Sequence, residues 1–168
     1  MAAVWVSGEM DAMFSLRPAT LDDAVTLAEI VMAATKHQGR WPAMTPADEQ
    51  EWRTGFADWS RQTLADVSVI VEGGEAIGRL RVVRGDGFLR LAGIQLLPSA
   101  QGRGIGTAIV RQLQSRARRE SVPLLIGVEK DNPRARQLYE RLGCVPVGEN
   151  EAGDEVELRW SGSGVQGP

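Results

Sequence analysis

The sequence predicts an α+β domain with a mostly antiparallel central sheet. Two observations lead to this fold class. Short apolar runs follow one another and are separated by glycine-rich turns, as in strands joined by hairpins. Longer segments with apolar residues at helical spacing stand before these runs and between the later ones. The expected order of elements is β-α-α-β-β-β-α-β-α-β-β, in which a connection through a helix permits parallel pairing.

The first half of the chain is expected to hold a strand, two helices and a hairpin. Thr20 offers an N-cap, and Asp22 and Asp23 follow in the first turn, where the helix dipole favours negative charge. The pair Gly73-Gly74 ends a β-branched run and signals a tight turn. The expected elements are a strand at 14–17, helices after Thr20 and from about Pro46, and strands at 67–71 and 76–83.

The second half is expected to alternate strands and helices. Pro98 closes a third strand, and Asn132-Pro133 combines an N-cap with a proline at the first helical position. Gly143 stands where that helix needs its C-cap. The expected elements are a strand at 88–97, a helix at 104–119, a strand at 124–128, a helix from Pro133, and strands at 144–147 and 155–160.

Composition favours one globular domain, because the chain has 168 residues, 43% hydrophobic and 24% charged. We expect an N-terminal extension at 1–13, the domain at 14–160 and a flexible Gly/Ser-rich tail at 161–168. A formal net charge of −3 gives no basic surface for nucleic acid or an anionic membrane. The sequence also shows neither a transmembrane run nor a signal peptide.

Few residues of the chain are suited to metal binding or to disulfides. The single cysteine, Cys144, excludes an internal disulfide and a cysteine-rich zinc site, and it reads as a small buried hydrophobe or as a reactive thiol. The single histidine, His37, cannot build a multi-histidine metal site. We therefore expect a metal-free cytoplasmic protein.

A glycine cluster follows the third expected strand. Gly102, Gly104 and Gly106 lie in a loop that opens a helix, where backbone N–H groups and the helix dipole can bind an anion. The spacing is neither the dinucleotide fingerprint nor a Walker A loop, because a third glycine and a Gly-Lys-Ser/Thr sequence are both missing. From spacing alone, a tight strand-to-helix turn without a ligand stays open.

Two motifs resemble those of the GNAT superfamily of N-acetyltransferases. Gln101, Gly104 and Gly106 match its coenzyme A signature, Gln/Arg-x-x-Gly-x-Gly/Ala. The segment 132–144 is similar to its Asn-x-x-Ala-x-x-Leu-Tyr-x-x-x-Gly-Phe segment, with Cys144 in place of the usual Phe. The two motifs stand in the family's order, and the order of elements fits from about residue 14 to 160.

The resemblance implies a GNAT-like fold with helices on both faces of the sheet, and acetyl-CoA as cosubstrate without a metal. In this family, the strand corresponding to 88–97 splays away from the strand at 124–128, and the pantetheine arm lies in the gap. Backbone amides near Leu96 and Leu97 would bond the pantetheine and the thioester oxygen. The implied cofactor-binding residues are Leu96, Leu97, Gln101, Gly102, Arg103, Gly104, Ile105, Gly106, Thr107, Asn132 and Ala135.

The resemblance also implies a general acid. Tyr139, the only tyrosine of the chain, stands at the family's tyrosine position, where a phenol protonates the departing thiolate. Tyr139 also shares a helical stripe with other apolar residues, so packing is the alternative. Many members carry a glutamate base on the strand corresponding to 88–97, but this strand offers only Gln95. Glu129 is the candidate base, with Glu72, His37 or ordered water as alternatives, and a weakly basic acceptor would need little help.

The acceptor is expected to be a small or medium-sized primary amine with an apolar portion. In this family, the two early helices and their loop line its pocket, where Trp41, His37 and Gln95 are the candidate contacts. The stripe of Trp52, Phe56 and Trp59 has the spacing of a core face. The family also allows a homodimer.

Two rival functions stay open. One is acetylation of a protein N-terminus or lysine, and the other is a coenzyme A-binding regulatory module that has lost catalysis. The intact glycine loop and Tyr139 favour an enzyme, whereas the missing strand carboxylate favours the module. A toxin acting on aminoacyl-tRNA is disfavoured by the acidic balance of the chain.

Overall fold

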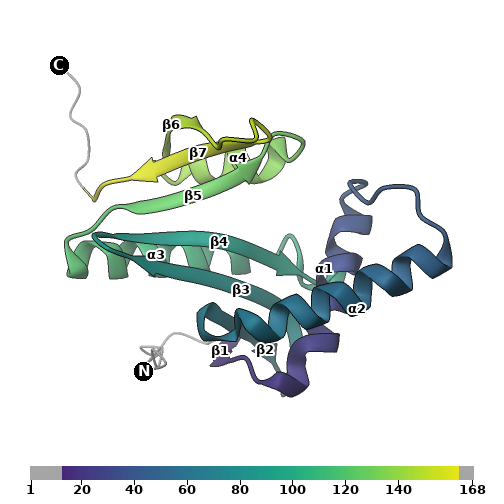
Figure 1. The fold of residues 1–168 in the computed structure, drawn as a ribbon. Coiled ribbons are helices and arrows are strands. Elements are labelled where there is room, and N and C mark those ends of the chain that lie inside the picture. Colours follow the sequence, from purple (N-terminus) through teal and green to yellow (C-terminus); the bar gives the residue numbers. More distant parts are fainter. Residues whose placement is uncertain (1–12, 163–168) are drawn as a thin grey trace. The chain divides into compact units, whose positions relative to one another are not determined.

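The structure is a computed structural model that describes residues 13–162 (Figure 1). Most of the expected extension (1–13) and of the expected tail (161–168) lies outside the described residues. Within the described range, the strands are β1 (Ser15–Pro18), β2 (Val67–Glu72), β3 (Glu75–Gly85), β4 (Phe88–Leu96), β5 (Leu124–Glu129), β6 (Val145–Glu149) and β7 (Glu155–Trp160). They follow the hydrogen-bonded order β1-β2-β3-β4-β5-β7-β6, and β4 and β5 pair in parallel. The predicted α+β class and the predicted order of elements are confirmed.

The chain divides into two compact units. Of the described residues, the first unit holds 13–81 and 94–105, and the second holds 82–93 and 106–162. Strands β3 and β4 each contribute to both units. The first unit carries β1 (Ser15–Pro18), the short 3₁₀ turn η1 (Leu21–Asp23), α1 (Ala24–His37), α2 (Pro46–Gln62), η2 (Leu64–Asp66), β2 (Val67–Glu72), most of β3 (Glu75–Gly85), the end of β4 (Phe88–Leu96) and η3 (Pro98–Ala100).

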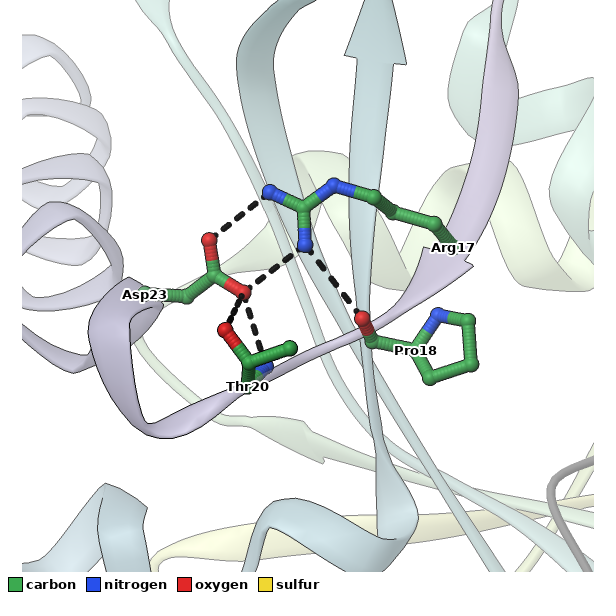
Figure 2. A network of polar contacts seen from close by, with 4 residues as sticks. All are labelled: Arg17, Pro18, Thr20 and Asp23. Atoms are coloured by element: carbon green, nitrogen blue, oxygen red, sulfur yellow. Dashed lines mark hydrogen bonds and ion pairs between the residues drawn. The ribbon is translucent and has the colours of Figure 1, made fainter.

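The start of α1 differs from the expected helix in one detail, because a 3₁₀ turn precedes it. Thr20 caps this turn, and the Asp23 carboxylate accepts hydrogen bonds from the Thr20 N–H at 2.7 Å and the Thr20 hydroxyl at 3.1 Å. Both terminal nitrogens of Arg17 donate to the same carboxylate, at 2.7 and 2.8 Å, and Nη1 also donates to Pro18 O (Figure 2). The Arg17 hydrogen bond is the main reason why the pKa of Asp23 falls to about 2.

Helices and strands of the first unit bury one apolar core. Helix α1 packs against α2 (Figure 1), and its Leu27 joins Val67 and Val69 of β2 in a fully buried cluster. Gly73 and Gly74 turn the β2–β3 hairpin at φ +57° and +83°, the left-handed conformation that glycine adopts without a steric cost. The hairpin predicted from this pair is confirmed.

The second unit combines the start of β4 with the C-terminal half of the chain. Its remaining elements are α3 (Ile105–Glu120), β5 (Leu124–Glu129), α4 (Pro133–Arg141), β6 (Val145–Glu149) and β7 (Glu155–Trp160). Strand β7 pairs antiparallel with both β5 and β6, and α4 packs against β5 (Figure 1). The buried side chains alternate along β5, as expected of a strand whose one face is covered.

The parallel pair is short. Its register joins Leu89–Leu91 of β4 to Leu124–Ile126 of β5, three residues on each strand. Beyond Ile126, the described register of β5 continues with β7 alone, through Glu129. The pairing with β4 therefore ends before β5 does.

Candidate functional site

The glycine loop joins β4 to α3 through the 3₁₀ turn η3. Gly102 and Gly104 have φ +71° and +83°, and a Cβ added at either position would meet no atom within 4 Å. Backbone conformation, and not crowding, therefore requires glycine here. Gln101 braces the loop, because its Nε2 donates to Leu96 O at 2.9 Å. The result is an exposed turn whose main chain is accessible to a ligand, directly before the first turn of a long helix.

Arg103, at the tip of this loop, forms a bidentate ion pair with Glu72 at the end of β2. Its two terminal nitrogens lie 2.5 and 3.1 Å from the Glu72 carboxylate oxygens. The hydrogen bond lowers the pKa of Glu72 and raises that of Arg103. Glu72 is thus held as a carboxylate against a fixed cation, which makes it a poor base.

The backbone around Leu97 is already engaged within the protein. The Leu97 N–H donates to Ile77 O at 2.8 Å, and Leu96 O accepts the Gln101 side chain. In this structure, the Leu97 N–H therefore already donates to a carbonyl of β3. The role of Leu96 and Leu97 toward a pantetheine arm stays a prediction.

Helix α4 buries the predicted general acid. Asn132 caps the helix, since its Oδ1 accepts from the Ala135 N–H at 3.2 Å, and Pro133 follows at the first helical position. Tyr139 is only 6% exposed, and burial, with a smaller contribution from Cys144, raises its pKa to about 12. The phenol therefore stays protonated at neutral pH.

Cys144 follows the turn that ends α4. Its N–H donates to Tyr139 O at 3.0 Å, and Gly143 turns the chain at φ +84°. The side chain is 3% exposed, and burial raises the pKa of its thiol to about 11. A thiol that keeps its proton is a weak nucleophile, so the buried-hydrophobe interpretation of Cys144 is the one that its environment favours.

The remaining second-unit candidates differ in exposure. Glu129 is exposed at the end of β5, opposite Glu155 of β7 in the register. Gly106 and Thr107 are half-buried in the first turn of α3, and a Cβ at Gly106 would come within 3.9 Å of the Leu138 side chain. Their roles toward a cofactor or an acceptor stay predictions.

The aromatic residues of the first unit form a continuous row. Trp41 meets Trp52 edge-on at 4.8 Å between ring centroids, Trp52 stacks on Phe56 at 4.9 Å, and Phe56 contacts Trp59 at 5.4 Å. Trp41 is half-buried and makes a cation–π contact with Lys36 at 5.7 Å. His37 lies exposed at the end of α1. The row thus has one end in the α1–α2 loop, where an acceptor contact was predicted.

The row ends on an arginine that sequence reasoning missed. Arg79 of β3 is 4% exposed, its guanidinium lies over Phe56 and Trp59, and its Nη1 donates to Gln95 Oε1 at 3.1 Å. Gly78 lets β3 approach β4, because a Cβ there would lie 2.8 Å from Gln95 O. The sequence signal is faint: an arginine between the apolar residues Ile77 and Leu80 of an expected strand.

The described residues contain no helix that is long and apolar enough to cross a membrane. Among residues 13–162, no group of three or more His, Cys, Asp or Glu side chains is placed to hold a metal ion.

The same arrangement of elements occurs in solved acetyltransferases. The PaiA N-acetyltransferase of Thermoplasma acidophilum, in complex with coenzyme A, matches with TM-score 0.69 and 14% identity over 88% of this chain and 98% of its own. An N-acetyltransferase of Staphylococcus aureus Mu50 matches with TM-score 0.65 and 14% identity over 87% and 100%. The histone acetyltransferase HPA2 and related acetyltransferase of Corynebacterium glutamicum matches with TM-score 0.65 and 22% identity over 88% and 94%. At these identities, the likeness shows the fold.

The family is established by sequence. Residues 31–144 match the model of the acetyltransferase (GNAT) family, and this chain belongs to that family. A comparison with curated protein sequences finds no match. Family membership supports an acyltransferase.

Proposed function

We propose that this chain is an N-acetyltransferase that moves the acetyl group of acetyl-CoA to a small or medium-sized primary amine. The observation that carries the proposal is the glycine loop between β4 and α3, in a chain of the GNAT family. Gly102 and Gly104 expose main chain that no side chain covers. Such a loop fits a pyrophosphate, whose oxygens accept hydrogen bonds from backbone N–H groups at the start of a helix.

The reaction is a direct transfer in a ternary complex. The amine nitrogen attacks the thioester carbon, the carbon–sulfur bond breaks, and an acetamide and coenzyme A are the products. Tyr139 gives its hydroxyl proton to the departing thiolate. A pKa of about 12 makes the phenol a weak acid, but burial raises the pKa of the neighbouring Cys144 thiol to about 11 in the same way. Burial raises the pKa of the departing coenzyme A thiol in the same way. Its thiolate is then a stronger base and can take the proton of the phenol.

A base must take the proton that the attacking amine loses. We assign this role to Glu129, an exposed carboxylate at the end of β5. Gln95 of β4 cannot accept a proton at neutral pH. Glu129→Gln tests the assignment, because loss of the base lowers the rate for amines with a pKa near that of lysine more than for weakly basic amines.

The acceptor is expected to carry an apolar or aromatic portion. The support is the aromatic row from Trp41 to Trp59, together with a net charge of −3 that attracts polycations only mildly. We also infer a cytoplasmic location, which fits a lone cysteine that is buried and free.

The test is an assay of thiol release from acetyl-CoA with a panel of amines, antibiotics and peptides. The proposal expects turnover with one class of small amines and stoichiometric N-acetyl product by mass spectrometry. Turnover with peptides or protein lysines alone would overturn the small-amine assignment and leave acetyl transfer standing. Coenzyme A binding without any acetyl transfer would favour the regulatory module.

A further inference from the structure

Arg79 is a buried cation without an acidic partner in the part of the chain that the structure describes. Its side chain is 4% exposed, and its Nη1 donates to Gln95 Oε1 at 3.1 Å. The other two nitrogens, Nε and Nη2, are buried and make no hydrogen bond. Removing a guanidinium from water without a counter-charge is costly, so such an arrangement calls for a reason.

The neighbours of Arg79 stabilise its charge without neutralising it. The guanidinium lies 5.4 Å from the ring centroid of Phe56 and 5.7 Å from that of Trp59, and the faces of both rings attract a cation. Arg81, two residues along the same strand, adds positive charge. Burial and then Arg81 lower the pKa of Arg79 to about 10, so it stays protonated at neutral pH.

Arg81 is the natural comparison for Arg79, because it lies on the same face of β3. Its guanidinium also lies over Trp59, 5.3 Å from the ring centroid. Its Nη2 lies 3.8 Å from the Asp66 carboxylate. Among residues 13–162, the more exposed arginine therefore has an acidic partner and the buried one has none. The missing negative charge at Arg79 is the feature to be explained.

Arg79 also sets the orientation of Gln95. A guanidinium can only donate, so the Gln95 atom that faces it must be the amide oxygen. The Nε2 group of Gln95 is then left to donate elsewhere, and within residues 13–162 it donates no hydrogen bond. Half-buried Gln95 thus presents an N–H donor backed by a buried positive charge.

We propose that Gln95 and Arg79 form a recognition site for a carboxylate on the acceptor, which makes the acceptor an amine of the amino-acid class. This inference rests on the proposed acetyl transfer. Gln95 Nε2 donates to the carboxylate, and Arg79 acts as a positioning residue that fixes the amide and supplies the charge. In surroundings of low dielectric, that charge acts on the anion with little screening. An apolar amino-acid side chain also suits the aromatic row beside Arg79.

A matched series of acceptors tests the proposal through the ratio of rates. The probes are L-phenylalanine, L-leucine and L-tryptophan, each with its carboxamide and its decarboxylated amine, assayed for kcat/KM with acetyl-CoA. We expect at least one free acid to exceed both of its neutral analogues by about tenfold or more. Turnover of amides and simple amines at rates equal to or above those of the acids overturns the inference and leaves acetyl transfer standing. Failure to bind acetyl-CoA overturns the proposed function itself.

Variants at the two arginines separate recognition from structure. Arg79→Met is expected to bring the acid-to-amide ratio close to one, Arg79→Lys to restore part of it, and Arg81→Met to keep the wild-type ratio. An equal loss for acid and amide in Arg79→Met would mean a purely structural role. Gln95→Glu places a carboxylate of the protein itself beside Arg79. The variant should therefore have a higher Tm and no preference for acids. A preference that persists in Gln95→Glu overturns the proposal even where Arg79→Met does not fold.

A binding measurement keeps the test independent of turnover. N-acetyl-L-phenylalanine, N-acetyl-L-leucine and N-acetyl-L-tryptophan, each with its carboxamide, are titrated into ¹⁵N-labelled protein. We expect at least one acid to shift the side-chain amide signals of Gln95 and the Nε–H signal of Arg79, and its amide to leave them in place. The absence of a difference for all three pairs contradicts the proposal. A loss of coenzyme A affinity in Arg79→Met, with acceptor binding unchanged, would place the anion on the cofactor instead.

Discussion

The loop at Gln101–Ile105 and the helix α4 carry the two motifs of the family, and they are built in opposite ways. The loop is exposed and polar, with glycines at positive φ and an arginine at its tip paired with Glu72. Helix α4 and the turn after it instead carry two buried groups, Tyr139 and Cys144, whose pKa values burial raises to about 12 and 11.

The contrast separates two chemical tasks. Binding a pyrophosphate requires accessible N–H groups, and an exposed loop leaves the charge of the ligand close to water. Giving a proton requires a group that still carries it at neutral pH, which burial ensures for a phenol. The exposed motif should therefore govern affinity for coenzyme A, and the buried motif should govern turnover.

The largest effect is expected at the buried motif. Tyr139→Phe removes the hydroxyl proton and keeps the ring that packs in the second unit, so kcat should fall by about 10²-fold or more. The KM for acetyl-CoA and the Tm should change little. Steady-state kinetics and thermal unfolding measure these quantities.

Cys144→Ala is the matched control for Tyr139→Phe, since it alters the other buried group of the same turn. It is expected to lower Tm through the cavity that it leaves, and to keep most of kcat. Wild-type turnover in Tyr139→Phe would return Tyr139 to a packing role, and a comparable loss of kcat in Cys144→Ala would break the contrast between the two residues.

The exposed motif should respond through affinity instead. Gly104→Val places a β-branched side chain at φ +83° in the turn that is proposed to bind the pyrophosphate. We expect the Kd for coenzyme A to rise by about tenfold or more, as when an anion loses well-placed backbone donors. Isothermal calorimetry measures the Kd in the folded variant.

The control for Gly104→Val is Gly87→Val, because Gly87 also has a positive φ, +76°, and no atom within 4 Å of an added Cβ. The two substitutions therefore carry a similar backbone strain. Equal Kd values for wild type and Gly104→Val, or an equal increase in Gly87→Val, would show that the loop is a turn without a ligand.

An intermediate effect is expected at Trp41, which lies in neither motif. Trp41→Ala removes the outer ring of the aromatic row, so the KM for the amine should rise by about tenfold while the KM for acetyl-CoA stays the same. Trp160→Phe, in the second unit, is the control and should change neither KM. An unchanged KM for the amine in Trp41→Ala would assign the row to the core alone.

Local signals in the sequence predicted the elements well, because each signal acts within a few residues. Gly73-Gly74, Pro46 and Asn132-Pro133 mark a turn and two helix starts through backbone preferences that need no distant partner. The 3₁₀ turn before α1 was not predicted. It depends on the Asp23 carboxylate, which bridges Thr20 and Arg17, three and six residues before it.

The site was less predictable, since its chemistry depends on burial and on distant pairs. Motifs located the glycine loop and Tyr139, but nothing local reveals that Glu72 pairs with Arg103 across 31 positions. Arg79 and Gln95 meet only because β3 and β4 are neighbours in the sheet. A buried cation also runs against the tendency of arginine to stay exposed, so no pattern predicts it.

The smallest effect is expected at the ion pair of Arg17 with Asp23, an exposed polar network of the first unit with no proposed role in binding. Its carboxylate has an ordinary pKa of 3.8 and a folded pKa of about 2, so the stabilisation is complete above the higher value and is lost as the pH falls through the lower one. Asp23→Asn should therefore lower the free energy of unfolding at neutral pH by about 1 kcal/mol, the usual cost of a lost cap contact at an exposed position. The difference from wild type should shrink as the pH falls from about 4 to about 2 and vanish below that, as measured by urea unfolding. Asp22→Asn, in the same turn, is the control, and neither substitution should alter the Kd for coenzyme A. A constant difference between wild type and Asp23→Asn over this range would contradict the assigned pKa, and a changed Kd would mean that exposed polar groups of the first unit act on the glycine loop beyond Glu72 and Arg103.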